Sequence, residues 1–310
     1  MFKRRLSLEV RNLCFGLVVL AGVAKADTRV AITVDDLPTH GKTSSSFTRK
    51  MMFDQTLGAF KKHGLSQVYG FINAKKDEEE STGEALLRQW ISAGQLLGNH
   101  TYAHVSLTKT GVDNYISEIE KNEPTLSKLM EGSNFKFFRY PFLHEGNTVA
   151  KRNAIRAYLT KHGYQIAEVT IDWEDWAWNN PYVNCLNQGR TAEAKTLEDS
   201  YIDFSLEKLS RAETLSRLIF GREIPQVLLV HIGAMNAKAM DRLLTAYEAH
   251  GVRFISLTEA LKDDVYRIDP GWLSTHGENF LDQIMQARDI KYPRGGRKVP
   301  TKEIQKVCSS

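Results

Sequence analysis

The order of apolar segments along the chain constrains the fold more than any other feature of the sequence. Short runs of β-branched and aromatic residues alternate with segments in which apolar residues recur at helical spacing. Each of four helical segments is followed by glycine, a common signal for the end of a helix. The candidate strands are residues 30–34, 67–72, 95–98, 136–140, 164–171, 227–231 and 252–256, and the candidate helices are 48–63, 82–93, 150–162 and 237–250. This order predicts a parallel α/β fold, and seven strands over this length favour a barrel with seven repeats.

Two regions fall outside this repeat. Residues 179–225 separate two candidate strands and are too long for a simple crossover. They include an amphipathic helix whose apolar residues lie on or near one face: Ile202, Leu206, Leu209, Leu215 and Leu218. This insertion either packs over the barrel or forms a cap that shapes a groove. We therefore expect one catalytic domain at 27–265 and a C-terminal extension at 266–310, which is rich in Pro, Gly and basic residues.

The first residues have the pattern of a secretory signal peptide. Basic residues 3–5 precede an apolar run at 14–23, and Ala24-Lys25-Ala26 fits the cleavage rule, so the mature chain is expected to start at Asp27. An uncleaved anchor helix is the alternative, but the run is short for a bilayer span of about 20 residues. The prediction is therefore an exported protein, periplasmic or secreted, with no membrane span after cleavage.

Removal of residues 1–26 changes the charge balance of the chain. The whole sequence has 41 Lys and Arg against 37 Asp and Glu, and the first 26 residues carry five of the basic side chains and one of the acidic, which leaves 36 of each. A neutral mature chain gives no support for nucleic-acid binding. Cys185 and Cys308 would remain, and in an oxidising compartment a disulfide between them and two free thiols are both plausible.

Two polar clusters follow candidate strands and suggest a metal site. Asp35 and Asp36 close the first strand, where one carboxylate can act as a ligand and the other as a base. His100 and His104 are four residues apart, so one helical turn would bring both imidazoles to one side. Two histidines and one carboxylate suit zinc and other divalent transition metals. Taken singly, each cluster is also explained by a turn, a helix cap or a surface pair.

Three further clusters occupy equivalent positions at strand ends. They contain Arg139 and Phe142 in Arg-Tyr-Pro-Phe, Asp175 and Trp176 in Asp-Trp-Glu-Asp-Trp, and His231 after Val-Leu-Leu-Val. Each alone is explained by an ion pair, an aromatic core or a buried histidine. His40, His144 and Glu145 also lie near strand ends. They either line the rim of the site or are surface polar groups, and the second interpretation is preferred.

The order of the five clusters resembles the polysaccharide deacetylases of carbohydrate esterase family 4, over about residues 30–260. The resemblance implies a distorted (β/α)7-type barrel, one divalent metal ion and hydrolysis of acetyl groups on carbohydrate. It implies that Asp36, His100 and His104 bind the metal, which is zinc by default, with Co, Mn or Ni as alternatives.

The resemblance also assigns the remaining roles. It implies that Asp35 is the general base, oriented by Arg139, and that His231 is the general acid, supported by Asp175. It implies that the backbone N–H of Phe142 donates to the oxyanion, and Trp176 is a candidate sugar-stacking residue. Two positions depart from the family pattern, because Val34 replaces a frequent Phe and Phe142 a frequent Tyr.

Export and the resemblance together favour one substrate class. We expect N-deacetylation of an N-acetylhexosamine polymer, with peptidoglycan ahead of chitin or another exopolysaccharide. An O-acetyl polysaccharide esterase and a non-catalytic glycan-binding protein on the same fold are the alternatives. The presence of both Asp35 and His231 counts against simple binding, because binding alone needs neither a base nor an acid.

Overall fold

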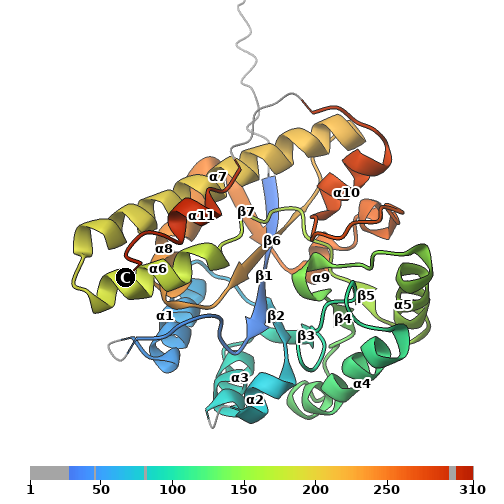
Figure 1. Cartoon of the computed structure of the whole chain (residues 1–310), viewed down its shortest axis with the longest axis horizontal. Helices are drawn as coiled ribbons and strands as arrows, with labels where there is room; N and C mark the ends of the chain where they lie inside the picture. Colours follow the sequence, from blue (N-terminus) through green and yellow to red (C-terminus); the bar gives the residue numbers. More distant parts are fainter. Residues whose placement is uncertain (1–27, 45–46, 80–81, 293–297, 310) are drawn as a thin grey trace, which may run out of the picture.

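A curved sheet of parallel strands forms the centre of the molecule, with helices around its outer face (Figure 1). The computed structural model describes residues 28–44, 47–79, 82–292 and 298–309, so the expected signal peptide lies outside the described residues. The strands are β1 (Thr28–Leu37), β2 (Tyr69–Ile72), β3 (Leu96–Asn99), β4 (Phe137–Phe138), β5 (Gln165–Ile166), β6 (Gln226–His231) and β7 (Val252–Ile255). Each lies within or overlaps a strand predicted from the sequence.

The topology confirms a seven-stranded parallel α/β sheet. The strand order is β5-β4-β3-β2-β1-β6, and β7 pairs with the first residues of β1. An isolated parallel bridge between Ile171 and Leu228 joins the segment after β5 to β6, which connects the two ends of this order. The β1–β6 register places Asp35 opposite His231, so two of the predicted clusters meet at one end of the sheet.

The helices connect and cover the strands. They are α1 (Arg49–Lys62), α2 (Ala74–Glu79), α3 (Gly83–Ser92), α4 (Val112–Leu129), α5 (Val149–Lys161), α6 (Trp176–Asn187), α7 (Thr191–Phe220), α8 (Ala234–His250), α9 (Leu257–Ala260), α10 (Phe280–Ala287) and α11 (Thr301–Ile304), with short 3₁₀ turns at Pro141–Leu143 and Asp264–Arg267. Helix α1 begins where the Thr48 side chain accepts the Met51 N–H, and it buries Phe53 and Phe60. Within the described residues, no helix is long and apolar enough to span a membrane.

The insertion packs against the barrel as two helices, α6 and the 30-residue α7 (Figure 1). Ile202, Leu209 and Leu215 are buried as the sequence indicates, but Leu218 is 47% exposed. The single apolar face expected for α7 is therefore wrong at Leu218. The physical reason is that α7 packs against α6, α8 and α10, so its buried residues do not form one stripe.

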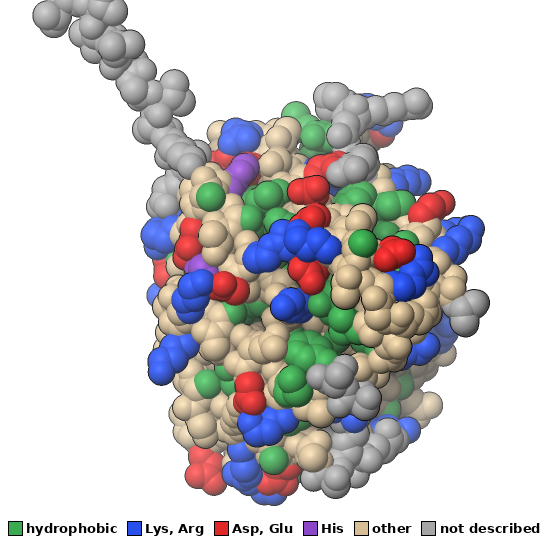
Figure 2. All heavy atoms as spheres, turned by 90° about the vertical axis from the view of Figure 1, so that its left-hand side faces the viewer, with side chains coloured by type: hydrophobic (Ala, Val, Ile, Leu, Met, Phe, Trp, Pro, Cys, Tyr) green, Lys and Arg blue, Asp and Glu red, His purple; other side chains and the backbone are tan. Residues whose placement is uncertain are grey.

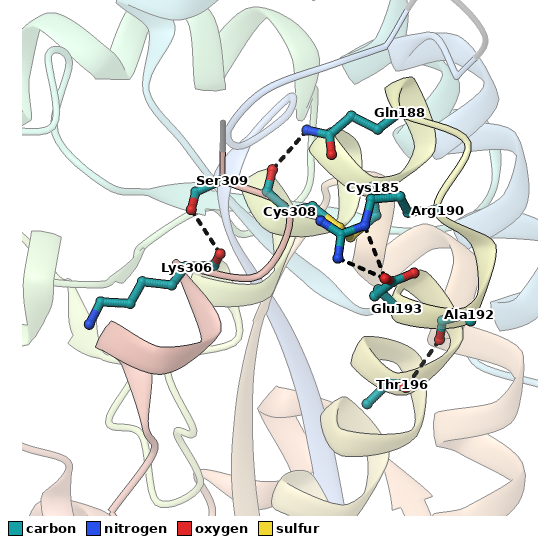
Figure 3. The surroundings of a disulfide bond; sticks show 9 residues. All are labelled: Cys185, Gln188, Arg190, Ala192, Glu193, Thr196, Lys306, Cys308 and Ser309. Carbon is teal, nitrogen blue, oxygen red and sulfur yellow. Dashed lines mark hydrogen bonds and ion pairs between the residues drawn. A yellow bond between two sulfur atoms is a disulfide. The ribbon is translucent and has the colours of Figure 1, made fainter.

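The C-terminal extension is tied to the insertion by a disulfide between Cys185 in α6 and Cys308 (Figure 3). The Gln188 side chain also donates a hydrogen bond to the Cys308 carbonyl oxygen at 3.0 Å. Phe280 and Leu281 of α10 are fully buried in the main core. The described residues of the extension, 266–292 and 298–309, therefore pack as part of the same body as the barrel.

Basic and acidic side chains lie interspersed on the face of the molecule drawn in Figure 2. Exposed ion pairs connect neighbouring helices: Arg242 of α8 lies 2.6 Å from Asp199 of α7, and Lys62 of α1 lies 2.7 Å from Asp241 of α8. Such exposed pairs are screened by solvent and contribute little to stability.

Candidate active site

A cavity of about 470 Å³ opens at the carboxyl ends of the strands and contains most of the predicted site residues. Its lining comprises Asp35, Asp36, His40, His100, His104, Phe142, Leu143, Asp172, Glu174, Trp176, Leu229, His231 and Gly277. Arg139 and Asp175 lie behind this lining and are buried. Thus the structure brings together all nine residues that the sequence analysis named.

Asp36, His100 and His104 form a compact donor group. The Oδ1 atom of Asp36 lies 3.2 Å from Nε2 of His104 and 3.6 Å from Nε2 of His100. The Nδ1 atom of His100 lies 2.8 Å from the Arg139 carbonyl oxygen, so Nδ1 carries the proton and Nε2 has a free lone pair. Such a hydrogen bond is the usual way to fix the tautomer of a metal-binding histidine.

These residues fit a divalent transition metal. The Oδ1 atom of Asp36 is buried and has no hydrogen-bond partner among the described residues, although the Lys76 ammonium lies 3.4 Å away. A buried carboxylate oxygen without a hydrogen bond beside two imidazole nitrogens is the donor set that a divalent cation requires. The three side chains offer one oxygen and two nitrogens, a set that leaves positions open for water and substrate.

The loop after β3 places the two histidines in a way that the sequence analysis did not predict. Residues 100–104 are not helical, and both Thr101 (φ 62°) and His104 (φ 53°) are left-handed. Side chains satisfy the backbone here instead of helical hydrogen bonds: Asn99 accepts the Thr101 N–H, and Glu118 accepts the Ala103 N–H. The expectation of a helical turn is therefore wrong, although the two imidazole rings do lie close, with centroids 5.0 Å apart.

Electrostatics keep the two histidines neutral and Asp36 ionised. Burial, together with His104 beside it, holds the pKa of His100 well below its usual value, and burial lowers the pKa of His104 to about 4. For Asp36, burial favours the neutral acid, but the His40 hydrogen bond and the Lys76 charge outweigh it and hold the pKa well below its usual value. Neutral imidazoles and an ionised carboxylate are the forms that bind a metal.

Asp35 forms a buried pair with Arg139. The Arg139 guanidinium donates from Nη1 to Oδ1 and Oδ2 of Asp35 at 2.9 and 3.1 Å. The remaining donors of Arg139 are also satisfied, because Nε reaches the Ala167 carbonyl oxygen at 2.6 Å and Nη2 the Thr33 hydroxyl at 3.0 Å. Arg139 is thus fixed and in turn fixes the orientation of Asp35.

Burial and the Arg139 charge act on the acidity of Asp35 in opposite directions. Burial raises the pKa of Asp35 to about 6, although the Arg139 charge opposes this shift. A carboxyl with this pKa is ionised at neutral pH and can accept a proton, as a general base must.

His231 and Asp175 form a second pair at the cavity. The Asp175 carboxylate accepts the His231 ring N–H at 2.7 Å, and its other oxygen accepts the His231 backbone N–H at 2.8 Å. Burial disfavours the charged imidazolium, but Asp175 outweighs burial and raises the pKa of His231 to about 9. His231 is therefore protonated at neutral pH and has an Nε2–H available to donate.

Phe142 and Trp176 give the cavity an aromatic rim. Their side chains are 53% and 38% exposed, a large fraction for aromatic residues in this protein. Phe142 is left-handed (φ 60°), and its ring lies 4.3 Å from that of His104. Exposed aromatic faces beside polar groups are suited to packing against sugar rings.

Several lining residues were missed by the sequence analysis, and His40 is the most informative of them. It was interpreted as a surface polar group, but its Nδ1 atom lies 2.9 Å from Oδ2 of Asp36 and its ring lies 4.8 Å from that of His231. Its position four residues after Asp36 was the available signal. Glu174 and Gly277 also line the cavity, and nothing in the local sequence marks Gly277 as part of a site.

The sequence profile of the family described as polysaccharide deacetylase matches residues 22–177, about half of the chain. The chain belongs to this family. It is 24% identical over 234 residues to a peptidoglycan-N-acetylglucosamine deacetylase from Bacillus cereus and 24% identical over 155 residues to a chitin deacetylase from Arthroderma benhamiae. These matches cover 74% and 49% of this chain, and they span 66% and 36% of the two relatives.

Solved structures of the same family have the same fold. A chitin deacetylase from Colletotrichum lindemuthianum superposes with a TM-score of 0.51 at 19% identity and covers 76% of this chain and 88% of its own. A carbohydrate esterase family 4 pseudoenzyme from Bacillus anthracis superposes with a TM-score of 0.51 at 16% identity, and the match covers 76% of this chain and 66% of the pseudoenzyme chain. A fold shared with both an enzyme and a pseudoenzyme does not establish activity, so the argument for activity depends on the site residues.

Proposed function

We propose that this polysaccharide deacetylase family member is a metal-dependent N-deacetylase. It removes acetyl groups from N-acetylhexosamine residues of an extracytoplasmic polysaccharide, with peptidoglycan as the leading substrate. One observation carries the proposal: a metal-binding group, a base paired with arginine and an acid paired with aspartate surround one cavity with an aromatic rim. Binding of a glycan without catalysis would require neither the Asp35–Arg139 pair nor the His231–Asp175 pair.

The residues supply the parts of a hydrolytic mechanism. When bound by Asp36, His100 and His104, a divalent metal supplies a Lewis acid for the acetyl carbonyl and lowers the pKa of a water. Asp35 accepts a proton from the attacking water, and Arg139 holds Asp35 in position. His231 donates its proton to the departing amine nitrogen as the carbon–nitrogen bond breaks, and Asp175 holds the protonated imidazole. The backbone N–H of Phe142 is the proposed donor to the oxyanion, and Trp176 is the proposed sugar contact.

Three observations support an extracytoplasmic location. The Cys185–Cys308 disulfide is typical of proteins that fold in oxidising compartments. The first 26 residues have the pattern of an export signal, and the relatives are named for polymers that lie outside the cytoplasm. We therefore propose a periplasmic or secreted enzyme.

Metal content is the first test. We expect about one metal ion per purified chain, with zinc the first to look for and Co, Mn or Ni compatible with the same ligands. His100→Ala and His104→Ala should each lose most of the metal, because each removes one of three ligands. The matched control is His162→Ala, because His162 is an exposed histidine at the C-cap of α5. Elemental analysis that finds full metal in both ligand variants would contradict the site.

Acetate release is the second test. Purified peptidoglycan and N-acetylglucosamine oligomers should release acetate with the wild-type holoenzyme and not with Asp35→Asn. Hydrolysis of O-acetyl esters with the amide untouched would decide for an esterase. No acetate from any N-acetylglucosamine polymer, with metal present, would refute N-deacetylation.

A further inference from the structure

His40 contacts the metal-ligand group although it is not one of the three proposed ligands. Its side chain is 30% exposed and lines the cavity, and its Nδ1 atom lies 2.9 Å from Oδ2 of Asp36. An ionised carboxylate has no proton to give, so the hydrogen bond runs from Nδ1–H of His40 to Asp36. The position of this proton also fixes the tautomer of His40.

The two oxygens of Asp36 therefore have different surroundings. Oδ2 accepts the His40 hydrogen bond, while Oδ1 is the atom close to Nε2 of His100 and of His104. A carboxylate held through one oxygen cannot rotate freely about its Cβ–Cγ bond, so the other oxygen stays directed at the two imidazoles. Hydrogen bonds of this kind orient metal ligands in many sites.

The loop that carries His40 is held in place from two sides. The His40 backbone N–H donates to the Ile232 carbonyl oxygen at 2.8 Å, directly after His231 in β6. Two residues on, the Asn179 side chain of α6 donates to the Lys42 carbonyl oxygen at 3.1 Å and accepts the Met235 N–H at 3.3 Å. Packing is tight here, because a Cβ at Gly233 would lie 3.1 Å from the His40 carbonyl oxygen. The insertion thus supports the loop from which His40 reaches Asp36.

We propose that His40 is a positioning residue for Asp36, which fixes this carboxylate so that only Oδ1 faces the metal. The inference rests on the metal site of the proposed function. The competing explanation is that His40 is itself a ligand, because Asp36, His40 and His231 form a second group of donor atoms within 4.8 Å of one another. In that second group Nδ1 of His40 is engaged with Asp36 and Nδ1 of His231 with Asp175, so only their Nε2 atoms could bind a metal, and the metal affinity of His40 variants separates the two explanations.

Two substitutions separate the hydrogen bond from the rest of the side chain. His40→Leu removes the donor and keeps a bulky apolar group in its place. His40→Asn keeps a donor, because the amide nitrogen of Asn lies two bonds beyond Cβ, as Nδ1 of His does. The matched control is His144→Leu, since Nδ1 of His144 is also engaged, at 2.8 Å from the Ser106 hydroxyl, and does not contact the proposed ligands.

The experiment measures the Kd for Zn²⁺ of the full mature chain by competition with a chelating dye. We expect His40→Leu to weaken binding about 10- to 100-fold, the range for residues that orient ligands. His40→Asn should stay within about threefold of wild type, and His144→Leu should be unchanged. Thermal unfolding of the metal-free variants checks that each is folded.

Four results would overturn the proposal. Unchanged Zn²⁺ affinity in His40→Leu would show that the hydrogen bond to Asp36 has no effect on metal binding. If His40→Asn weakened Zn²⁺ binding as much as His40→Leu, a donor at this position would not be what supports binding. If His40→Leu lost Zn²⁺ binding as completely as His104→Ala, His40 would be a ligand rather than a positioning residue. Wild type that binds no metal would refute the proposed function as well, which distinguishes that failure from the other three.

Discussion

Asp35 and Asp36 are neighbours in the chain, but their surroundings shift their acidities in opposite directions. Burial dominates at Asp35 and raises its pKa to about 6, whereas His40 and Lys76 outweigh burial at Asp36 and hold its pKa low. Asp36 is left-handed (φ 63°), which lets consecutive side chains serve one cavity in different ways. Groups whose environments separate their pKa values are often those with distinct catalytic roles.

At the same scale, the acidity of His231 depends on Asp175. Asp175→Asn removes the charge that raises the pKa of His231, so the effect of burial should then dominate and the pKa should fall from about 9. At neutral pH the imidazole would lose the proton that it is proposed to donate. We expect the alkaline limb of the kcat profile to move to lower pH, and NMR titration of the His231 ring protons to show the same direction.

The control for this titration is a second histidine–aspartate pair. Asp241 lies 2.9 Å from Nε2 of His63, far from the cavity lining, and contributes to the raised pKa of His63. Asp241→Asn should lower the pKa of His63 and leave that of His231 unchanged. An unaltered His231 titration in Asp175→Asn would contradict the role of Asp175.

At the scale of single elements, the sequence predicts the strands better than the helices. All seven strands exist, although β4 and β5 are only two residues long where five and eight were expected. Helix α4, at Val112–Leu129, was not predicted at all. Pro124 inside it is a poor helix signal, yet Tyr115, Ile119 and Leu126 are fully buried. Tertiary packing outweighs local propensity in this segment.

Two glycines in helices should respond to alanine in opposite ways. Gly58 lies in the exposed interior of α1, and an added Cβ would meet nothing within 4 Å. Gly58→Ala should raise the free energy of unfolding by about 0.5–1 kcal/mol. Gly221 is the C-cap of α7 and has φ 69°, a left-handed conformation that is unfavourable for alanine. Gly221→Ala should therefore lower the free energy of unfolding by about 1 kcal/mol. Urea unfolding measures the change in the free energy of unfolding for each variant. Changes in the same direction would contradict this explanation.

The disulfide between α6 and the C-terminal extension closes a long loop. The sequence separation of Cys185 and Cys308 is 123 residues, and cross-links of this kind stabilise by about 2–5 kcal/mol. Cys308→Ala should therefore lower the unfolding temperature measured by calorimetry. Reductant should destabilise wild type to a similar extent and have no further effect on the Cys185→Ala/Cys308→Ala double variant. A reductant effect in that double variant would argue for another cause.

At the scale of the whole molecule, the C-terminal extension forms part of the wall of the cavity. Gly277 lines the cavity, and a Cβ there would lie 1.9 Å from the Phe142 carbonyl oxygen. On the same wall, the Thr301 hydroxyl donates to the Glu174 carboxylate at 2.6 Å. The extension and the barrel therefore share one site, although the sequence suggests two separate parts.

Gly277→Ala tests this contact. The added methyl group must displace the Phe142 backbone, whose N–H is the proposed oxyanion donor, and small displacements of this kind cost about 10- to 100-fold in rate. We expect kcat/KM for N-acetylglucosamine oligomers to fall by that factor. Because the added methyl group clashes with backbone, the unfolding temperature should also fall, so kcat/KM is measured at a temperature at which the variant is folded. Thr275→Ala, two residues earlier and exposed, is the control and should keep wild-type kinetics.

The sequence by itself predicted the fold class and the order of the seven strands along the chain, which the structure confirms, and it named nine residues that lie in or behind the cavity lining. It could do so because strand periodicity and the residues at strand ends are local features, and parallel strands bring their carboxyl ends to one edge. Only the tertiary structure decided the hydrogen bond from His40 to Asp36, the approach of Gly277 to Phe142 and the pairing of Cys185 with Cys308. These contacts depend on how loops and a distant extension pack in space, and no local pattern in the sequence records that packing.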